Sequence, residues 1–350
     1  MAGHFHQLKI KEVRRETPST VSIALEIPDH LRDEFHFDAG QYITFKETLD
    51  GEELRRSYSL CSAPGDGEWR VAVKEVPDGR FSRWVNREWG HGRVVDTMPP
   101  MGNFVIPTFV GHHVGLAAGS GITPMISIIK SLLQSSDDAR FTLFYGNKNY
   151  DEIIFREELD RLKTRFDGRL EVVHVLSQEQ RPGYGHGRLD IARLDSQIAQ
   201  GLDVLSVRAF YLCGPSEMIF SMKEHLEQKG VSTERIRFEL FSAPAPGADD
   251  SEQKTEVPSS DGLVNTYILD GERFEVEVKD TDMTILDIGL DHGIDLPFAC
   301  QGGVCCTCRA QVLEGEVDMR QNFSLSSSEV EEGFVLTCQS YPKGGSATLD

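Results

Sequence analysis

The sequence lacks any long hydrophobic run and any excess of basic residues. No segment approaches the roughly 18 consecutive apolar residues that a membrane helix needs, and the opening MAGHFHQLKIKEVRRE has no apolar stretch of the secretory kind. Lys and Arg number 36 against 56 Asp and Glu, a formal net charge of -20. Binding to nucleic acid takes cationic side chains in excess. These absences predict a cytoplasmic protein that binds neither membrane nor nucleic acid.

Cysteine is scarce except in one place. Of seven cysteines, four lie in FACQGGVCCTC, residues 298–308. Because thiols stay reduced in the cytoplasm, this grouping favours metal or redox chemistry over disulfides. Cys300, Cys305 and Cys308 have C-x4-C-x2-C spacing, and Cys338 follows after 29 intervening residues. This is the plant-type pattern in which four thiolates hold a 2Fe-2S cluster.

Cys306 is the extra thiol of this stretch. Making it the middle ligand would break both intervals, so we expect a small buried or rim residue beside the cluster. Gly302 and Gly303 allow the backbone to wrap closely round an anionic centre and direct N–H groups at it. A zinc ion bound by these thiols is the alternative interpretation. Zinc sites more often combine C-x2-C with a second pair of Cys or His, and no such pair stands near Cys338.

The C-terminal residues 263–350 have the pattern of a small α+β domain. TYILDGERFEVEV reads as two strands joined by an Asp-Gly turn, TILDIGLDHG as a short helix that ends at Gly293, and CRAQVLEGEVDM as a further strand-turn-strand. The preceding residues 246–262 are rich in Pro, Ser, Gly and acids, the composition of a linker.

A cluster that accepts electrons needs a donor, and LRRSYSLCSAP supplies a candidate flavin site. In an extended strand Arg56 and Tyr58 point to one face and Ser57 and Ser59 to the other. A guanidinium suits a pyrophosphate, and a phenol ring suits a flat isoalloxazine. A plain edge strand is the alternative interpretation of the same residues.

A nucleotide site is predicted after residue 108. In VGLAAGSGITPMISIIKSLL an apolar strand runs into Gly119, Ser120 and Gly121, and Pro124 stands at the start of an apolar helix, which presents its N-terminus to phosphate. Further strand-like runs, FTLFYGNKN, LEVVHVLSQ and FYLCGPSEM, alternate with helical stretches. That alternation predicts a parallel α/β sheet over residues 109–245.

Together these motifs resemble the ferredoxin-NADP reductase superfamily. The resemblance implies FAD in an antiparallel β-barrel over residues 1–108, with VKEVPDGRFSRWV as the second flavin element and Gly79 and Ser82 opening a phosphate-binding helix. It also implies catalytic roles for Ser59 and Cys213 and a β-grasp fold for the ferredoxin domain. The other cofactor-binding residues that it implies are Lys74, Thr123, Gly214, Pro215 and Phe241, the last as a cover for the flavin.

Coenzyme choice rests on one loop, SQEQRPGYGHGR. Ser177, Arg181, Tyr184 and Arg188 offer hydroxyl and cationic partners for the 2'-phosphate of NADPH. Gln178 stands where many NADP-dependent relatives have Arg. Glu179 is close enough to serve the ribose of NADH instead. We expect NADPH, with NADH as the alternative.

The domain order and the sequence DLPFACQGGVCCTCRAQVLEGEVDM resemble the reductase components of bacterial multicomponent oxygenases, and within them the reductase subunits of phenylacetyl-CoA epoxidases. The resemblance implies an NAD(P)H-dependent oxidoreductase that delivers electrons to a di-iron terminal oxygenase. The alternatives are a reductase for a ring or steroid hydroxylase, and a redox sensor whose output is binding to a partner. The histidines of HFH and GHH are expected to be solvated or to cap elements.

Overall fold

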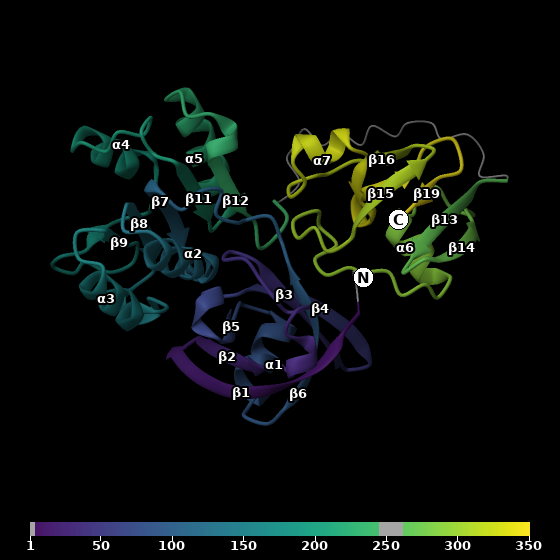
Figure 1. The fold of residues 1–350 in the computed structure, drawn as a ribbon, viewed down its shortest axis with the longest axis horizontal. Helices are drawn as coiled ribbons and strands as arrows, with labels where there is room; N and C mark the ends of the chain where they lie inside the picture. The colour runs from purple at the N-terminus through teal and green to yellow at the C-terminus, as the bar shows by residue number, and fades with distance from the viewer. Residues whose placement is uncertain (1–3, 245–261) are drawn as a thin grey trace. The chain divides into compact units, whose positions relative to one another are not determined.

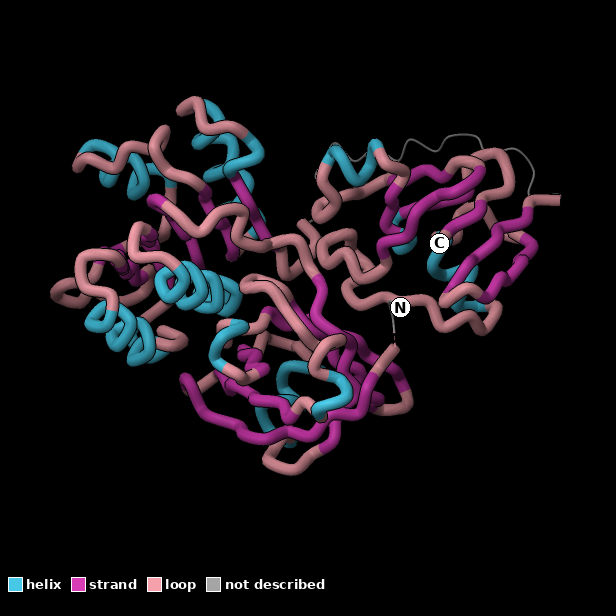
Figure 2. Tube along the Cα trace, viewed as in Figure 1, coloured by secondary structure: helices cyan, strands magenta, loops and turns pink. Residues whose placement is uncertain are grey.

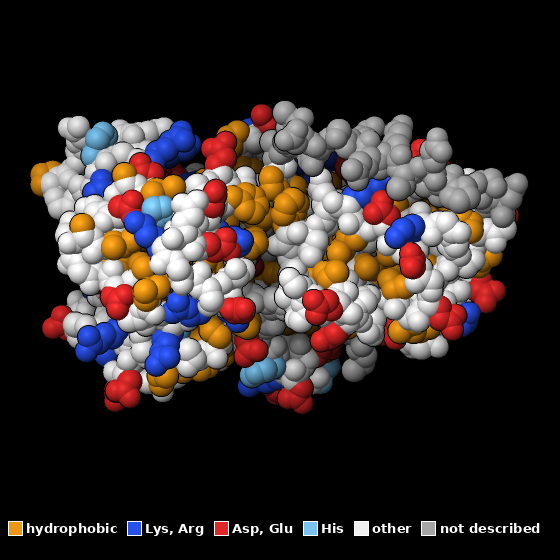
Figure 3. All heavy atoms as spheres, turned by 90° about the horizontal axis from the view of Figure 1, so that it is seen from above, with side chains coloured by type: hydrophobic (Ala, Val, Ile, Leu, Met, Phe, Trp, Pro, Cys, Tyr) orange, Lys and Arg blue, Asp and Glu red, His pale blue; other side chains and the backbone are white. Residues whose placement is uncertain are grey.

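The computed structural model describes residues 4–244 and 262–350. The chain divides into two compact units: His6–Leu240 contains the first two sheets, and the other unit contains the third (Figures 1 and 2). Of the predicted linker 246–262, all but Gly262 lies outside the described residues. Within the described ranges no helix is long and apolar enough to span a bilayer. On the face in Figure 3, acidic and basic side chains are interspersed.

The first sheet is antiparallel, with six strands in the order β4-β3-β6-β1-β2-β5. An antiparallel bridge from Leu60, directly after β4, to Val71 in β5 joins the two edge strands and closes a barrel. Phe81 and Val85 of α1 are buried in the barrel core. The elements are β1 (His6–Thr17), β2 (Thr20–Glu26), β3 (Tyr42–Leu49), β4 (Glu52–Ser59), β5 (Trp69–Lys74), α1 (Arg80–Glu88) and β6 (Val94–Met101), with 3-10 turns η1 (Asp29–Leu31) and η2 (Pro64–Asp66).

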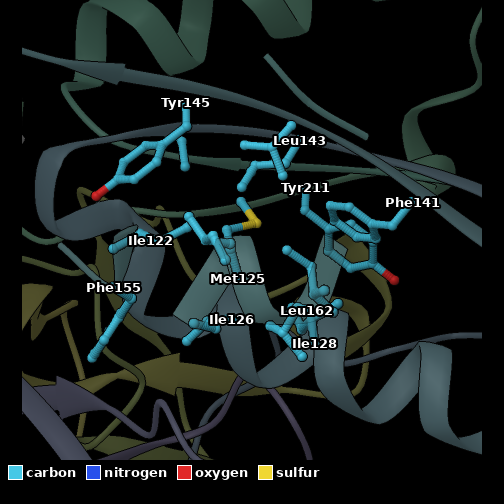
Figure 4. Packing of buried hydrophobic residues seen from close by; sticks show 14 of the residues in the cluster. Ile122, Met125, Ile126, Ile128, Phe141, Leu143, Tyr145, Phe155, Leu162 and Tyr211 are labelled. Atoms are coloured by element: carbon cyan, nitrogen blue, oxygen red, sulfur yellow. The ribbon is translucent and has the colours of Figure 1, made fainter. Parts of the chain in front are cut away.

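The second sheet is parallel, in the order β10-β9-β8-β7-β11-β12. Ile122 and Met125 of α2 pack towards Leu143 and Tyr145 of β8 (Figure 4). The elements are β7 (Gly111–Ala118), η3 (Gly119–Gly121), α2 (Ile122–Ser135), β8 (Ala139–Asn147), η4 (Tyr150–Glu152), α3 (Arg156–Arg165), β9 (Leu170–Leu176), β10 (Gly185–His186), α4 (Ile191–Ala199), β11 (Ala209–Cys213), α5 (Ser216–Gln228), η5 (Thr233–Arg235) and β12 (Ile236–Glu239).

The third sheet is mixed, in the order β14-β13-β19-β15-β17, beside a two-stranded β16-β18 sheet. The predicted Asp-Gly turn is confirmed, because Asp270 (φ 51°) and Gly271 (φ 83°) link β13 to β14. The predicted helix is confirmed too, and Gly293 follows its end. The elements are β13 (Val264–Leu269), β14 (Glu272–Glu277), α6 (Ile285–Asp291), β15 (Arg309–Glu314), β16 (Val317–Met319), α7 (Ser327–Glu331), β17 (Phe334–Leu336), η6 (Thr337–Gln339), β18 (Ser340–Pro342) and β19 (Thr348–Leu349).

Two expectations differ from the structure. The strands at 309–319 do not pair with each other: β15 pairs with β17 and β19, and β16 pairs with β18. His113, expected to be solvated or to cap an element, is fully buried in β7, where its ring stacks on Tyr211 with centroids 6.1 Å apart. Nothing near it in the sequence indicates this, since the stacking partner comes from β11.

Buried His113 predicts acid sensitivity of the parallel sheet. Burial lowers the pKa of His113 to about 4 from an ordinary value of 6.5. Between these values the unfolded chain binds a proton that the folded chain refuses, so stability that is fully present above pH 6.5 is lost as pH falls towards 4. The loss approaches about 1.4 kcal/mol per pH unit in that window.

His113→Phe keeps an aromatic ring at this position. It should remove the part of the pH dependence of stability that comes from His113. Hydrogen exchange of the β7 amides between pH 7 and 5 measures it, after correction for the intrinsic exchange rate. His36→Gln, at an exposed position, is the control. A His113→Phe slope equal to that of the parent would contradict the prediction.

Candidate functional site

The predicted flavin residues lie along β4 as the alternation requires. Tyr58 is half-buried, with Phe45 and Phe81 on either side at centroid distances of 6.1 Å each. Burial raises the pKa of Tyr58, so the phenol stays neutral. Arg56 is exposed and donates to the Arg55 carbonyl at 2.7 Å. The Ser57 hydroxyl lies 2.9 Å from that of Thr44, in the neighbouring strand β3.

Gly79 and Ser82 form the start of α1, as predicted. Gly79 is the residue before the helix, and the Ser82 hydroxyl accepts from the Val76 N–H at 3.2 Å. A Cβ at Gly79 would stand 2.4 Å from the Val76 side chain and 2.5 Å from the Ser82 hydroxyl. Any larger residue would therefore displace this turn. The result is a nine-residue helix whose first N–H groups are open to an anionic group.

Ser59 and Cys213 come together around the carboxylate of Glu239, a residue for which no role was predicted. The buried Ser59 hydroxyl donates to Glu239 Oε2 at 2.8 Å. This hydrogen bond joins the end of β4 in the barrel to β12 of the parallel sheet. Glu239 is the strand partner of Cys213, which is fully buried at the end of β11. Burial raises the pKa of Glu239 to about 7, although the Ser59 hydroxyl acts to lower it. Burial also holds the pKa of Cys213 well above its ordinary value, so its thiol stays neutral.

The glycine turn after β7 lies in close contact with the backbone at the end of β11. Gly119, Ser120 and Gly121 form the 3-10 turn η3, and a Cβ at Gly121 would stand 2.0 Å from the Cys213 carbonyl oxygen. The Thr123 hydroxyl donates to the Ser120 carbonyl at 3.0 Å. Gly121 therefore keeps the turn against β11, and the N-terminus of α2 opens beside it.

The remaining predicted nucleotide residues follow the strands of the same sheet. Pro124 is buried in the first turn of α2, Gly214 follows β11, and Pro215 precedes α5. Lys74 ends β5 of the barrel, and its Nζ lies 4.0 Å from the position of a Cβ on Gly119. Phe241, the expected cover of the flavin, is 46% exposed.

The coenzyme loop is more constrained than its sequence indicates. Arg181 lies 3.5 Å from the centre of the Tyr150 ring and contacts Glu179 at 3.4 Å. Glu179 also accepts from the Tyr150 backbone N–H at 2.8 Å. The Ser177 backbone N–H and hydroxyl both donate to the Asn147 carbonyl, at 2.9 and 3.3 Å. Arg188 is exposed. A 2'-phosphate near Arg181 therefore meets a carboxylate as well.

In the other unit the four predicted thiols form two pairs. Contact with Cys305 lowers the pKa of Cys300 to about 6 and raises that of Cys305. Contact with Cys308 likewise lowers the pKa of Cys338. Within residues 4–244 and 262–350 no three His, Cys, Asp or Glu side chains gather as a site for one metal ion. Two thiol pairs fit a cluster of two irons with four cysteine ligands.

Backbone geometry round these thiols also suits a cluster. The Gly302 N–H donates to Cys300 Sγ at 3.4 Å. Gln301, Gly303 and Cys306 all have positive φ, at 51°, 73° and 55°, so the chain curls tightly through the loop. Cys306 donates instead to the Ser324 carbonyl at 3.3 Å and takes no part in either thiol pair.

Sequence reasoning missed Glu239 and Glu152. Glu239 stands in IRFELF, where an acidic residue at the end of an apolar strand was the available signal. Glu152 binds Ser19 and Lys74 of the barrel, residues more than 75 positions away, so no local pattern marks it.

Comparison with known families assigns all three parts of the chain. "Oxidoreductase FAD-binding domain" matches residues 7–106, "Oxidoreductase NAD-binding domain" matches 116–224, and "2Fe-2S iron-sulfur cluster binding domain" matches 267–343. FAD, a pyridine nucleotide and a 2Fe-2S cluster are therefore the groups this chain uses, as predicted. The three matches leave the preference between NADH and NADPH open.

Individual relatives extend over the whole chain. A component of 1,2-phenylacetyl-CoA epoxidase from Escherichia coli (strain K12) is 37% identical over 99% of this chain and 97% of its own length. The ferredoxin reductase component of 3-ketosteroid-9-alpha-monooxygenase from Rhodococcus rhodochrous is 33% identical, over 96% and 93%. In fold, the chain matches phthalate dioxygenase reductase with a TM-score of 0.58 at 21% identity, covering 99% of this chain and 98% of that one. The chain therefore belongs to the reductase components of oxygenases, oxidoreductases that pass electrons from a pyridine nucleotide through FAD and a 2Fe-2S cluster.

Proposed function

We propose that this chain takes electrons from NADPH and delivers them to the oxygenase of a phenylacetyl-CoA epoxidase, a di-iron enzyme. The observation that carries the proposal is the 37% identity to a component of the Escherichia coli epoxidase, which extends over 99% of the chain. Since the match includes the ferredoxin domain, from which electrons leave, it bears on the partner as well as on the cofactors.

The flavin is held by residues of the barrel. Arg56 and the N-terminus of α1 at Gly79 and Ser82 would hold the FAD phosphates, and Tyr58 would contact the ring system. The chemistry that FAD would supply there is the conversion of a two-electron donation by the coenzyme into single-electron transfer. Ser59, Glu239 and Cys213 line the side on which nicotinamide approaches, where the neutral Cys213 thiol provides a contact surface and Glu239 provides the charge.

The coenzyme lies along the carboxyl edge of the parallel sheet. Its pyrophosphate binds at the Gly119–Gly121 turn with help from Lys74. The 2'-phosphate of NADPH binds Ser177, Arg181 and Arg188. Arg181 exchanges Glu179 for this phosphate, which offers a doubly charged partner in place of a single carboxylate.

A steroid hydroxylase is the second candidate partner. The observation favouring it is the 33% identity to the reductase component of 3-ketosteroid-9-alpha-monooxygenase over 96% of this chain. Both partners need the same cofactors, so they differ only in the surface on which the ferredoxin domain docks.

Reconstitution separates the two partners. The purified chain should support product formation by the oxygenase of the Escherichia coli epoxidase at least about tenfold faster than by the oxygenase of the Rhodococcus enzyme, a barrier difference of about 1.4 kcal/mol. NADPH should give the higher kcat/KM. Ferricyanide reduction, which bypasses docking, is the control. Faster turnover with the steroid oxygenase would refute the epoxidase assignment.

The thiol pairs predict which cysteines hold the cluster. Each of the single substitutions of Cys300, Cys305, Cys308 or Cys338 by Ser should abolish the rhombic electron paramagnetic resonance signal of the reduced 2Fe-2S centre, because one of the two irons would lose one of its two protein thiolates. Cys306→Ser should keep the signal. A signal that persists in Cys305→Ser and disappears in Cys306→Ser would exchange the two roles.

Glu239 predicts a pH dependence of coenzyme oxidation. Nicotinamide becomes positively charged when it gives up hydride, so an ionised Glu239 beside it favours that step. With a pKa of about 7, the rate of flavin reduction should rise as pH increases through 7. Glu239→Gln should remove this inflection, as measured by anaerobic stopped-flow absorbance.

The same variant should raise the stability of the protein at high pH although it lowers the reaction rate. The pKa of Glu239 in the folded chain lies above its ordinary 4.5, so the parent protein loses stability as pH rises through the window from 4.5 to 7. Glu239→Gln should therefore be more stable than the parent at pH 8 while reacting more slowly. Glu234→Gln, at an exposed position in η5, is the control. A variant that is both slower and less stable would indicate structural damage instead.

A further inference from the structure

Glu152 connects the nucleotide sheet to the flavin barrel. It lies in η4, which follows β8 after two intervening residues. Its Oε2 accepts a hydrogen bond from the Ser19 hydroxyl at 2.7 Å and contacts Lys74 Nζ at 3.1 Å. Ser19 lies in the β1-β2 hairpin, and Lys74 ends β5. One carboxylate oxygen thus holds two side chains of the barrel.

The same lysine lies beside the phosphate turn. Its Nζ is 4.0 Å from the position of a Cβ on Gly119, the first residue of η3. Lys74 and Glu152 are 21% and 19% exposed, so water screens their attraction only in part. The ammonium group therefore lies between the Glu152 carboxylate, which it contacts, and the turn.

Glu152 carries its charge at neutral pH. Burial by itself raises the pKa of this carboxyl, but the Ser19 hydroxyl and Lys74 outweigh it, and the pKa is lowered overall. The positive charge of Lys148, in the loop after β8, acts in the same direction. A stable negative charge is thus fixed next to the lysine that the coenzyme needs.

We propose that Glu152 is an internal competitor of the coenzyme pyrophosphate for Lys74. The proposal rests on the coenzyme site proposed above. When the coenzyme binds, Lys74 leaves the carboxylate for the phosphate and Glu152 keeps its hydrogen bond to Ser19. When the coenzyme leaves, the ion pair forms again. Because the pyrophosphate is common to NADH and NADPH, Glu152 weakens the binding of both equally and eases release of the oxidised product.

A purely structural tie makes different predictions. If Glu152 only joins the two domains, its loss lowers stability and leaves coenzyme binding unchanged or weaker. If it competes, its loss strengthens binding. The sign of the change in coenzyme affinity therefore decides between the two roles.

Glu152→Gln in the full chain tests the competition, since the amide oxygen can still accept from Ser19. The measurements are the Kd of NAD⁺ and of NADP⁺ from flavin difference spectra, and the KM of NADH and NADPH with ferricyanide. We expect both coenzymes to bind about three- to tenfold more tightly. Lys74→Met should weaken both. In the Lys74→Met background, Glu152→Gln should have no further effect, because the contested charge is gone.

Asp66→Asn is the matched control. Asp66 contacts Lys130 at 3.3 Å and joins the same two domains, about two turns along α2 from the phosphate turn. It should leave both Kd values unchanged. Unchanged or weaker binding in Glu152→Gln, or tighter binding that persists in the double variant, overturns the competition while leaving the proposed function intact. If Lys74→Met binds both coenzymes as the parent does, the pyrophosphate position is wrong as well.

Discussion

The geometry of the candidate site depends first on the contact between the glycine turn and the end of β11. Gly121 has room for no side chain, because a Cβ there would stand 2.0 Å from the Cys213 carbonyl. That approach places the phosphate turn, the neutral thiol and, through strand pairing, Glu239 at one edge of the parallel sheet. Since the Ser59 hydroxyl donates to Glu239, the position of the end of β4 is tied to the same backbone approach.

Polar and apolar contacts between the barrel and the nucleotide sheet have separate roles. Ala39, Cys61 and Phe104 of the N-terminal part join the core built on α2, which supplies apolar burial. The hydroxyl of Ser127, in α2, donates to the Ser62 carbonyl at 2.6 Å. These contacts can fix the relative position of the two domains without charge. The charged contacts at Glu239 and Glu152 are therefore available for chemistry, because rigidity does not depend on them alone.

The elements that sequence predicts well are those whose signals are local. The spacing of Cys300, Cys305 and Cys308, the Asp-Gly turn at 270–271 and Gly79 before α1 each involve residues within one turn or loop, and the turn and Gly79 lie where the pattern indicates. Burial of His113 depends on Tyr211, almost a hundred residues away, and the pairing of β15 depends on β17 and β19. Strand partners chosen by tertiary packing leave no mark in a local pattern.

The same distinction explains why the site was only partly predictable. A motif shows which residues can bind a phosphate, but not which carboxylates stand nearby. Arg181 appears in the sequence as a free cation, yet it lies on Tyr150 and beside Glu179, and Lys74 lies on Glu152. Both cations that we propose for coenzyme binding thus have an acidic partner in the structure. An enzyme that must release its product after each turnover gains from such pairing, since the exchange of one anionic partner for another costs less than leaving a charge without one.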